Sequence, residues 1–392
     1  MAHVLMGFAE ALAAPEAFFS LYHAGHQVSV FAREGARNPI LNRLPLVGIH
    51  WLPAPECNAP AAIKKLDQTL KKVAPDAVLP LDDPGLWLAD RVIGCDSRLA
   101  GGIGDATAVA LDKARQITAA RTAGLTPPET IVVSTHRDLE NIKTLPAIAK
   151  PALTVGLTAD GTRLTKSGVT YLPDMAAVQA LHNNLEASIP PLLVQPLIHG
   201  VGEGVFGFAG AHGVCNFSGH RRLRMMNPHG SGSSACRTIP INSELQTAVA
   251  RFVTAIGWRG PFMVELLRDI DGTPWFMELN GRMWGSLALA RAQGFEYPAW
   301  AVDQVLDPKF EPTAVTPRTE SLTARHLGRD LLHLAFVARG PKSEFHRQGW
   351  PRLLSSLADV LRPANRTYNT DPAFPNFAWR DALHTVWRHL HR

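Results

Sequence analysis

Short apolar runs and amphipathic segments alternate along the first hundred residues. Four strands are predicted from apolar runs at 3–9, 27–32, 49–52 and 77–81. Two helices are predicted from helical spacing of apolar residues at 14–24 and 61–72. This order is typical of a parallel sheet covered by helices. The turn after the first run lacks the Gly-x-Gly-x-x-Gly pattern, so we expect no dinucleotide site there.

Asp82 and Asp83 directly follow the fourth apolar run. In open α/β sheets, ligands bind at the carboxyl ends of the strands, which makes the two aspartates candidates for a substrate site. An ordinary turn after a strand explains them equally well.

A different pattern begins near residue 100, where the Gly-rich sequence LAGGIGDATA indicates a domain boundary. Helices are predicted at 106–123, 244–256 and 283–292. Strands are predicted at 131–133, 147–150 and 192–195, followed by a hairpin of 204–208 with 214–217. The Gly-rich segments 154–165 and 227–234 are predicted to be loops.

The segment 260–285, GPFMVELLRDIDGTPWFMELNGRMWG, carries the clearest hairpin pattern of the chain. Two apolar runs, 262–270 and 274–279, flank the dipeptide Asp271-Gly272, which is a strong signal for a two-residue type I′ turn. With that turn, pairing residues back from the turn places Glu265 directly opposite Glu278.

Asn280 follows Glu278 by two residues, so strand alternation places its amide on the same face as the paired glutamates. Like charges directly opposite each other destabilise a sheet, and a bound cation would relieve the repulsion. Glutamate and asparagine supply oxygen ligands, which suit Mg²⁺ or Mn²⁺ and not zinc. The pairing alone leaves a metal site and the solvated face of an edge hairpin equally open.

The carboxyl-terminal part begins with the Pro-rich sequence FEPTAVTPRTE and then shows two apolar stripes at helical spacing, within 350–361 and 379–390. From Glu311 onward there are twelve Lys and Arg against seven Asp and Glu. A basic helix with tryptophans can lie on a membrane surface. Docking of the second helix on its own domain is the expectation we favour.

The length of 392 residues predicts two or three domains, and 46% hydrophobic residues fit a soluble globular protein. The chain shows no apolar run long enough to span a membrane and no signal-peptide pattern. Its four cysteines are far apart and form no CxxC pair, which favours reduced thiols and a cytoplasmic protein over a zinc site. No nucleic-acid-binding module accompanies the basic tail, so no nucleic-acid partner is expected. Oligomeric state is not indicated.

Taken in order, several motifs of residues 105–306 resemble the ATP-grasp superfamily, in its branch of carbamoyl-phosphate-synthase-like or carboxylate-amine ligases. The matching sequences are LDKARQITAARTAGLTPPET with Lys113, IAKP with Lys150, VQPLIHG at the adenine hinge, and Glu265 followed by Glu278-x-Asn280-x-Arg282. The resemblance covers about half of the chain.

The resemblance implies a fold of mixed α/β and α+β class. A Rossmann-like domain at 1–104 would precede a two-lobed ATP-grasp domain at 105–308. Beyond these, the apolar stripes and the charge count predict a basic, mainly helical extension at 309–392. The resemblance also implies ATP and Mg²⁺ or Mn²⁺ as cofactors, with a small-molecule carboxylate and an amine as substrates.

The resemblance assigns roles by position. Lys113 and Lys150 would contact the α- and β-phosphates as compact cations. Glu265, Glu278 and Asn280 would hold the metal that bridges the phosphates. Arg282 would stabilise the transferred phosphoryl group, because a guanidinium can hold two oxygens at once. Arg221 and Arg222 are further candidates, of which strand alternation lets only one face the site. A surface position explains that pair equally well.

At the hinge, four residues would contact adenine: Gln195, Pro196, Leu197 and Ile198. Pro196 stands where the family often has an acidic residue, yet its carbonyl can still accept a hydrogen bond, and the Ile198 N–H can donate one. Glu203 is a candidate for the ribose hydroxyls, with a solvated loop glutamate as an equal alternative. The loop at 154–165 is a candidate phosphate lid.

Three functions follow. The first is an ATP-dependent ligase that activates a carboxylate as an acyl phosphate for capture by an amine, with release of ADP and phosphate. The second is a phosphotransferase that acts on a hydroxyl or a carbamate. The third is a nucleotide-binding interaction module whose basic tail docks on a membrane or a partner.

Overall fold

The computed structural model describes residues 1–94, 96–165, 168–184, 191–230, 232–316, 320–342, 344–347 and 349–391. Cys95, Ser231 of the predicted Gly/Ser loop and Arg392 of the basic tail lie outside these residues. The three described cysteines form no disulfide.

The first hundred residues form a parallel four-stranded sheet in the order β3-β2-β1-β4. Its strands are β1 (His3–Gly7), β2 (Gln27–Arg33), β3 (Gly48–Leu52) and β4 (Ala77–Pro80). The accompanying helices are α1 (Ala14–His23), α2 (Pro39–Arg43), α3 (Ala59–Val73) and α4 (Asp83–Ile93). The predicted parallel sheet is therefore confirmed, and β1 and β4 are nearly or fully buried, as strands of such a sheet should be.

The helix predicted at 106–123 is two helices, α5 (Asp105–Ala110) and α6 (Lys113–Thr122). The break occurs because the Asp112 side chain accepts hydrogen bonds from the N–H groups of Ala114 and Arg115, which caps a new helix. This cap places Lys113 at the first position of α6.

A small antiparallel sheet follows, in the order β5-β10-β6-β9. Its strands are β5 (Ile131–Val133), β6 (Ala147–Pro151), β9 (Thr170–Leu172) and β10 (Leu192–Pro196), and η1 (His136–Asn141) and α7 (Met175–Asn183) pack with them. The predicted loop at 154–165 contains a short ribbon, β7 (Gly156–Leu157) with β8 (Leu164–Thr165).

The largest sheet has seven strands in the order β15-β14-β11-β12-β13-β16-β17. They are β11 (Val201–Gly210), β12 (Gly213–Met225), β13 (Ser233–Ile239), β14 (Gly260–Arg268), β15 (Pro274–Asn280), β16 (Thr323–Arg325) and β17 (Arg366–Thr367). One face packs on α8 (Ser243–Ala255), where Phe262, Val264 and Leu266 of β14 meet Phe252 in one buried cluster. Glu265 lies between these residues in β14 and therefore points to the other face.

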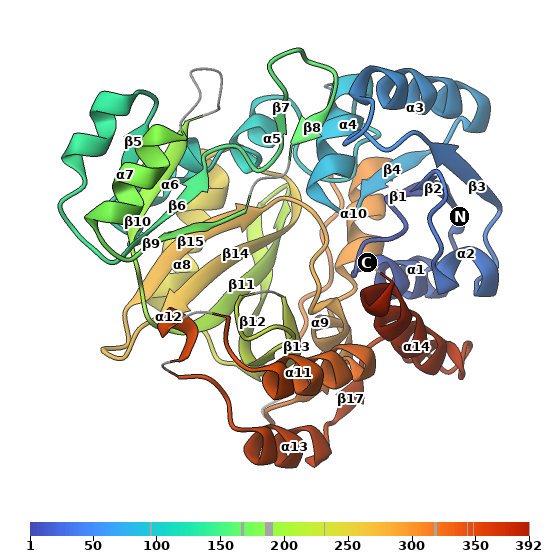
Figure 1. Cartoon of the computed structure of the whole chain (residues 1–392). Helices are drawn as coiled ribbons and strands as arrows, with labels where there is room; N and C mark the ends of the chain where they lie inside the picture. The colour runs from blue at the N-terminus through green and yellow to red at the C-terminus, as the bar shows by residue number, and fades with distance from the viewer. Residues whose placement is uncertain are drawn as a thin grey trace.

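Two helices follow the hairpin, α9 (Leu287–Ala292) and α10 (Tyr297–Leu306), and both contact α1 of the amino-terminal domain. The predicted helix at 283–292 thus begins only at Leu287. Figure 1 shows the amino-terminal domain beside the large sheet and the small sheet beyond it.

The carboxyl-terminal segment contains α11 (Leu327–Arg339), α12 (Glu344–Arg347), α13 (Leu353–Leu361) and α14 (Phe377–Leu390). The sequence pattern did not predict α11, which contacts β13, α13 and α14. The tail also supplies β16 and β17, which extend the large sheet.

The helix α14 docks on the protein through contacts with α11 and α2, as favoured, but its apolar stripe points outward. Trp379, Leu383 and Leu390 are 63%, 68% and 70% exposed, while Phe377 and Asp381 are buried. The buried face forms because the Asp381 carboxylate binds Asn369 and His326. None of the described helices is long and apolar enough to cross a membrane.

Candidate active site

The predicted opposition of Glu265 and Glu278 is confirmed, although the predicted turn is wrong. Arg268 pairs with Pro274, and Gly272, at φ 86°, donates to the Asp269 carbonyl. This is a longer turn than a type I′ turn, and it shifts the pairing by one residue. A bulge between the pairs Leu266–Phe276 and Glu265–Glu278 shifts it back. The two deviations cancel at the glutamates.

Three oxygen-bearing side chains, those of Glu265, Glu278 and Asn280, lie together on this face. Asn280 lies close to Glu278, with its amide nitrogen 3.5 Å from Oε1. Within the described residues, no group of three or more His, Cys, Asp or Glu side chains is placed to hold a metal. The donor set therefore consists of two carboxylates and one amide, and fits Mg²⁺ only together with oxygens from a bound phosphate.

Two lysines from different elements face these carboxylates. Lys113 Nζ lies 3.6 Å from Glu278 Oε2 and 3.0 Å from the hydroxyl of Thr154. Lys150 in β6 is buried, and burial lowers its pKa against the attraction of Glu278. Since a lysine in such a site is stabilised by added negative charge, the pair of lysines suits a polyphosphate.

A buried glutamine that the sequence reasoning missed fixes Lys113 relative to the hairpin. Gln116 Oε1 accepts the Leu279 N–H at 2.8 Å, and its amide donates to the Ala110 carbonyl at 2.8 Å. These bonds join α6 to the strand that carries Glu278. The sequence signal is a polar residue on the buried face of a short helix, one turn after the lysine.

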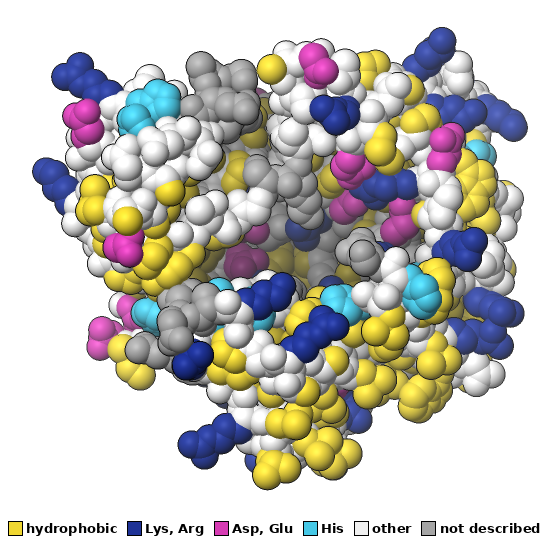
Figure 2. Space-filling view, in the orientation of Figure 1, with side chains coloured by type: hydrophobic (Ala, Val, Ile, Leu, Met, Phe, Trp, Pro, Cys, Tyr) yellow, Lys and Arg dark blue, Asp and Glu magenta, His cyan; other side chains and the backbone are white. Residues whose placement is uncertain are grey.

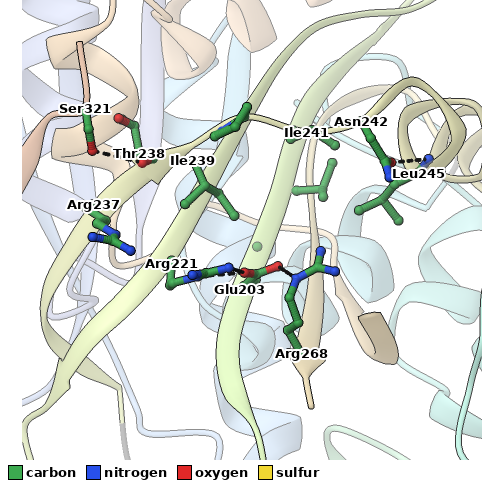
Figure 3. Close-up of a pocket in the computed structure, with 13 residues that line it drawn as sticks. Glu203, Arg221, Arg237, Thr238, Ile239, Ile241, Asn242, Leu245, Arg268 and Ser321 are labelled. Carbon is green, nitrogen blue, oxygen red and sulfur yellow. Dashed lines mark hydrogen bonds and ion pairs between the residues drawn. The ribbon is translucent and has the colours of Figure 1, made fainter. Parts of the chain in front are cut away.

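The structure separates the adjacent arginines of β12. Arg222 lies on the face of Glu265, with Nη2 2.7 Å from Oε1. Arg221 lies on the opposite face, where its Nε donates to Glu203 Oε1 at 2.7 Å, and Arg268 binds the other oxygen of Glu203 at 2.8 Å. Figure 3 shows Glu203 between these two arginines.

Glu203 is therefore neither in a flexible loop nor on the face of Glu265 and Glu278. It belongs to β11, is 3% exposed, and is held by two arginines on the face that packs on α8. The structure gives no support to a ribose contact there. A cavity of about 600 Å³ lies on this face, lined by Glu203, Arg221, Arg237 and Arg268 among others, and so lies apart from the lysines and paired glutamates.

Arg282 forms an ion pair that joins the amino-terminal domain to the hairpin. Its Nε and Nη2 lie 3.1 and 3.3 Å from the two oxygens of Asp83. Burial works against the charge of Arg282, but the carboxylate of Asp83 and the charges of Glu278 and Asp82 raise its pKa. The predicted phosphoryl contact would require Arg282 to share its guanidinium with Asp83.

Asp82 caps α4 by accepting the Gly85 N–H at 2.8 Å. Burial raises the pKa of Asp82 to about 6, although Arg33 at 3.4 Å attracts its charge. Arg33 also binds Glu10 and Glu56. The two aspartates thus serve both as the beginning of a helix and as charged groups at the carboxyl end of β4, next to Arg282.

The predicted hinge lies in and directly after β10. Gln195 shares a sheet face with Leu193, the partner of Lys150, and its Oε1 is buried without a hydrogen-bond partner in the described structure. The Leu197 N–H donates to the Pro146 carbonyl at 2.9 Å. The Leu197 N–H is thereby bound within the protein, whereas Gln195 Oε1 has no partner among the described residues.

Figure 2 shows a hollow near the centre of the face shown, with acidic and basic side chains inside it. The charged groups of this site come from β6, α6, β12, β14 and β15.

No protein-family model and no curated protein matches this sequence. Among solved structures, the chain is similar to an L-amino acid ligase from Bacillus licheniformis, with 18% identity over 82% of this chain and 78% of that one, at a TM-score of 0.62. It is also similar to N5-carboxyaminoimidazole synthetase from Staphylococcus aureus, with 14% identity over 84% and 83% of the chains and a TM-score of 0.61.

A third similar structure is the biotin carboxylase domain of 2-oxoglutarate carboxylase from Hydrogenobacter thermophilus, in complex with MgADP, ADP and bicarbonate. Its identity is 13%, over 82% and 74% of the chains, and the TM-score is 0.62. These similarities show that the chain has the ATP-grasp fold, as the sequence resemblance implied.

Proposed function

We propose that this protein is an ATP- and Mg²⁺-dependent ligase that joins a carboxylate to an amine and releases ADP and phosphate. The observation that carries the proposal is the convergence of Lys113, Lys150 and Arg222 on the paired carboxylates of Glu265 and Glu278. Three cations around two carboxylates and an amide match the charges of a metal-bound triphosphate. The MgADP of the Hydrogenobacter structure supports ATP and Mg²⁺ as the cofactors.

The reaction has two steps. A carboxylate oxygen of the substrate attacks the γ-phosphorus, and the bond from that phosphorus to the β–γ bridging oxygen breaks, which releases ADP. The amine nitrogen then attacks the acyl carbon, the carbon–oxygen bond to phosphate breaks, and the nitrogen loses a proton. The amide and inorganic phosphate are the products.

The residues have separable roles in these steps. Lys113 and Lys150 would bind the phosphates as point charges. Glu265, Glu278 and Asn280 would hold Mg²⁺, which supplies charge neutralisation when bound. Arg222 and Arg282 flank the glutamates and would stabilise the negative charge on the transferred phosphoryl group. We assign Arg221 and Glu203 a structural role on the other face of the sheet.

The names of three similar structures support carboxylate-amine joining, and biotin carboxylases are also among the similar structures. The three are an L-amino acid ligase, N5-carboxyaminoimidazole synthetase and phosphoribosylglycinamide synthetase.

The test is to incubate the protein with ATP, Mg²⁺ and pairs of amino acids or small carboxylates, and to identify the nucleotide product. We expect ADP and phosphate in the presence of both substrates, and a hydroxamate when hydroxylamine replaces the amine. Formation of AMP would contradict an acyl-phosphate mechanism, and a stable phosphorylated product formed without an amine would indicate a phosphotransferase.

A further inference from the structure

A second cavity, of about 270 Å³, lies where the amino-terminal domain meets the carboxyl-terminal helices. Its walls come from the loop after β1, the start of α1, Met226 after β12, and helices α11 and α14. Figure 1 shows α14 passing below the amino-terminal domain. The loop after β1 is at the carboxyl end of a parallel strand, which is where ligands bind in open α/β sheets.

The two sides of this cavity carry opposite charges. Glu10 lies on the side of the amino-terminal domain, and Arg329, His384 and Arg388 lie on the side of α11 and α14. The other lining carboxylate, Asp381, is already bound by Asn369 and His326. Glu10 is therefore the acidic group available to a ligand.

Two lining atoms are buried and lack a hydrogen-bond partner within the described residues, Glu10 Oε2 and His384 Nε2. Glu10 is held through its other oxygen, Oε1, which accepts the Arg33 N–H at 3.0 Å. Buried polar atoms without a partner cost free energy, so a ligand that supplies a donor to Glu10 and an acceptor or donor to His384 would be stabilised.

The cations on the helical side repel one another. Burial lowers the pKa of Arg329, against the attraction of Tyr368, Asp381 and Cys236, and the positive charge of Arg388 lowers it further. The pKa of His384 is lowered by burial and by Arg388, against the attraction of Asp381. A carboxylate placed among these groups would relieve the repulsion.

The cavity also has an apolar wall. Leu12, Pro15, Met226 and Leu332 line it between the two charged sides. Its volume is below that of sites for drug-sized ligands and suits a small molecule. Opposite charges at two sides with an apolar wall between them match an α-amino acid with an apolar side chain.

A chain of ion pairs runs from the cavity wall to Arg282. Arg33 contacts both Glu10 and Asp82, and Asp83, next to Asp82, binds Arg282. The segment after Arg282 packs on the cavity wall, because a Cβ added to Gly285 would lie 2.5 Å from Leu12 Cδ2. An amine bound at Glu10 would therefore lie at the wall whose ion pairs extend to Arg282.

We propose that this cavity binds the amine substrate, and that this substrate is an α-amino acid with an apolar side chain. The proposal rests on the proposed ligase function. The ammonium group of the amino acid contacts Glu10, and its carboxylate contacts Arg388 and His384. The carboxyl-terminal segment then forms part of the substrate site, and α14 selects amines that carry a carboxylate.

The test is isothermal titration calorimetry of the full chain with L-leucine, with and without Mg²⁺ and a non-hydrolysable ATP analogue. Isocaproate lacks the amine and isoamylamine lacks the carboxylate of leucine, and each should bind at least about tenfold more weakly. Glu10→Gln and Arg388→Met should each weaken leucine binding by about tenfold or more. Arg380→Met, an exposed arginine of the same helix, is the matched control and should leave binding unchanged.

Equal binding of leucine and its two analogues would overturn the proposal. So would binding that survives both cavity variants, or the absence of leucine binding under both conditions. Because calorimetry requires no turnover, leucine binding without ADP formation would uphold the cavity as an amino-acid site and count against the ligase function alone. If the protein formed ADP with an amine that lacks a carboxylate, and Arg388→Met did not change this activity, the ligase function would be upheld and the cavity would be contradicted as the amine site.

Discussion

Arg221 and Arg222 are adjacent in β12 but point to opposite faces of the sheet, so each is the control for the other. Arg222→Met removes the cation 2.7 Å from Glu265 on the face of the paired glutamates. Arg221→Met removes the partner of Glu203, which is buried on the other face. We expect the first substitution to reduce activity and the second to reduce stability.

The magnitudes follow from the surroundings. A charged group aimed at the transition state contributes about 3 kcal/mol, so Arg222→Met should lower kcat/KM by roughly a hundredfold. Glu265 is partly exposed, and the hydrogen bond that it loses in Arg222→Met should cost about 1 kcal/mol of stability. Glu203 is 3% exposed and keeps only Arg268, so Arg221→Met should cost about 2 kcal/mol of stability while kcat/KM changes by less than about threefold.

The assays are ADP release at saturating ATP and urea unfolding of the nucleotide-free protein. A circular dichroism spectrum like that of the wild type would show that both variants fold. Equal loss of activity in the two variants, or a larger loss in Arg221→Met, would refute the assignment of Arg222 to the active face.

Three further predictions concern buried charges and the carboxyl-terminal helix. Burial raises the pKa of Asp82 from 3.8 to about 6, so between these pH values the folded protein binds more protons than the unfolded protein. Its stability therefore falls as the pH rises through this range. Asp82→Asn keeps the α4 cap, and in urea unfolding it should be more stable than the wild type at about pH 7 but not at about pH 4. Lys150→Met should stabilise the nucleotide-free protein by about 1 kcal/mol, because burial disfavours the lysine charge. The same substitution should abolish the rise in Tm that MgATP causes. A variant that is less stable than the wild type and is still protected by MgATP would contradict the role of Lys150 in phosphate binding. Leu383→Ser, on the exposed side of α14, should change the free energy of unfolding by less than about 0.5 kcal/mol. Phe377→Ala, on the buried side, should lower it by about 3 kcal/mol in the same assay. Equal effects of the two substitutions would contradict the orientation of the helix.

Local patterns were sufficient for the amino-terminal sheet and for the existence of the hairpin, whereas the opposition of the two glutamates was predicted through a turn that the structure does not have. Buried strands are continuous apolar runs, and the hairpin has a clear turn signal. The register was predicted through a two-residue turn, while the structure has a longer turn and a compensating bulge near Phe276. A bulge adds one residue to one strand of a pair, and the apolar pattern of the two strands does not show where that extra residue lies.

Contacts between distant segments could not be predicted from one sequence. The pair Arg282–Asp83 joins residues 199 positions apart, and the bond from Gln116 to Leu279 spans 163. The orientation of α14 was also missed, because its apolar stripe suggested burial whereas a buried aspartate, Asp381, anchors the helix. Helical periodicity identifies an apolar face but does not show whether a partner surface covers it.

The central claim is that the paired glutamates hold the metal of a bound nucleotide. The most direct test is the paramagnetic relaxation of water protons by Mn²⁺ with ATP, titrated against the wild type, Glu265→Gln and Glu278→Gln. Glu244→Gln, at an exposed position in α8, is the control. We expect strong enhancement with the wild type and the control, and at least about tenfold weaker Mn²⁺-ATP binding in each of the other two variants. Unchanged binding in both would contradict the site.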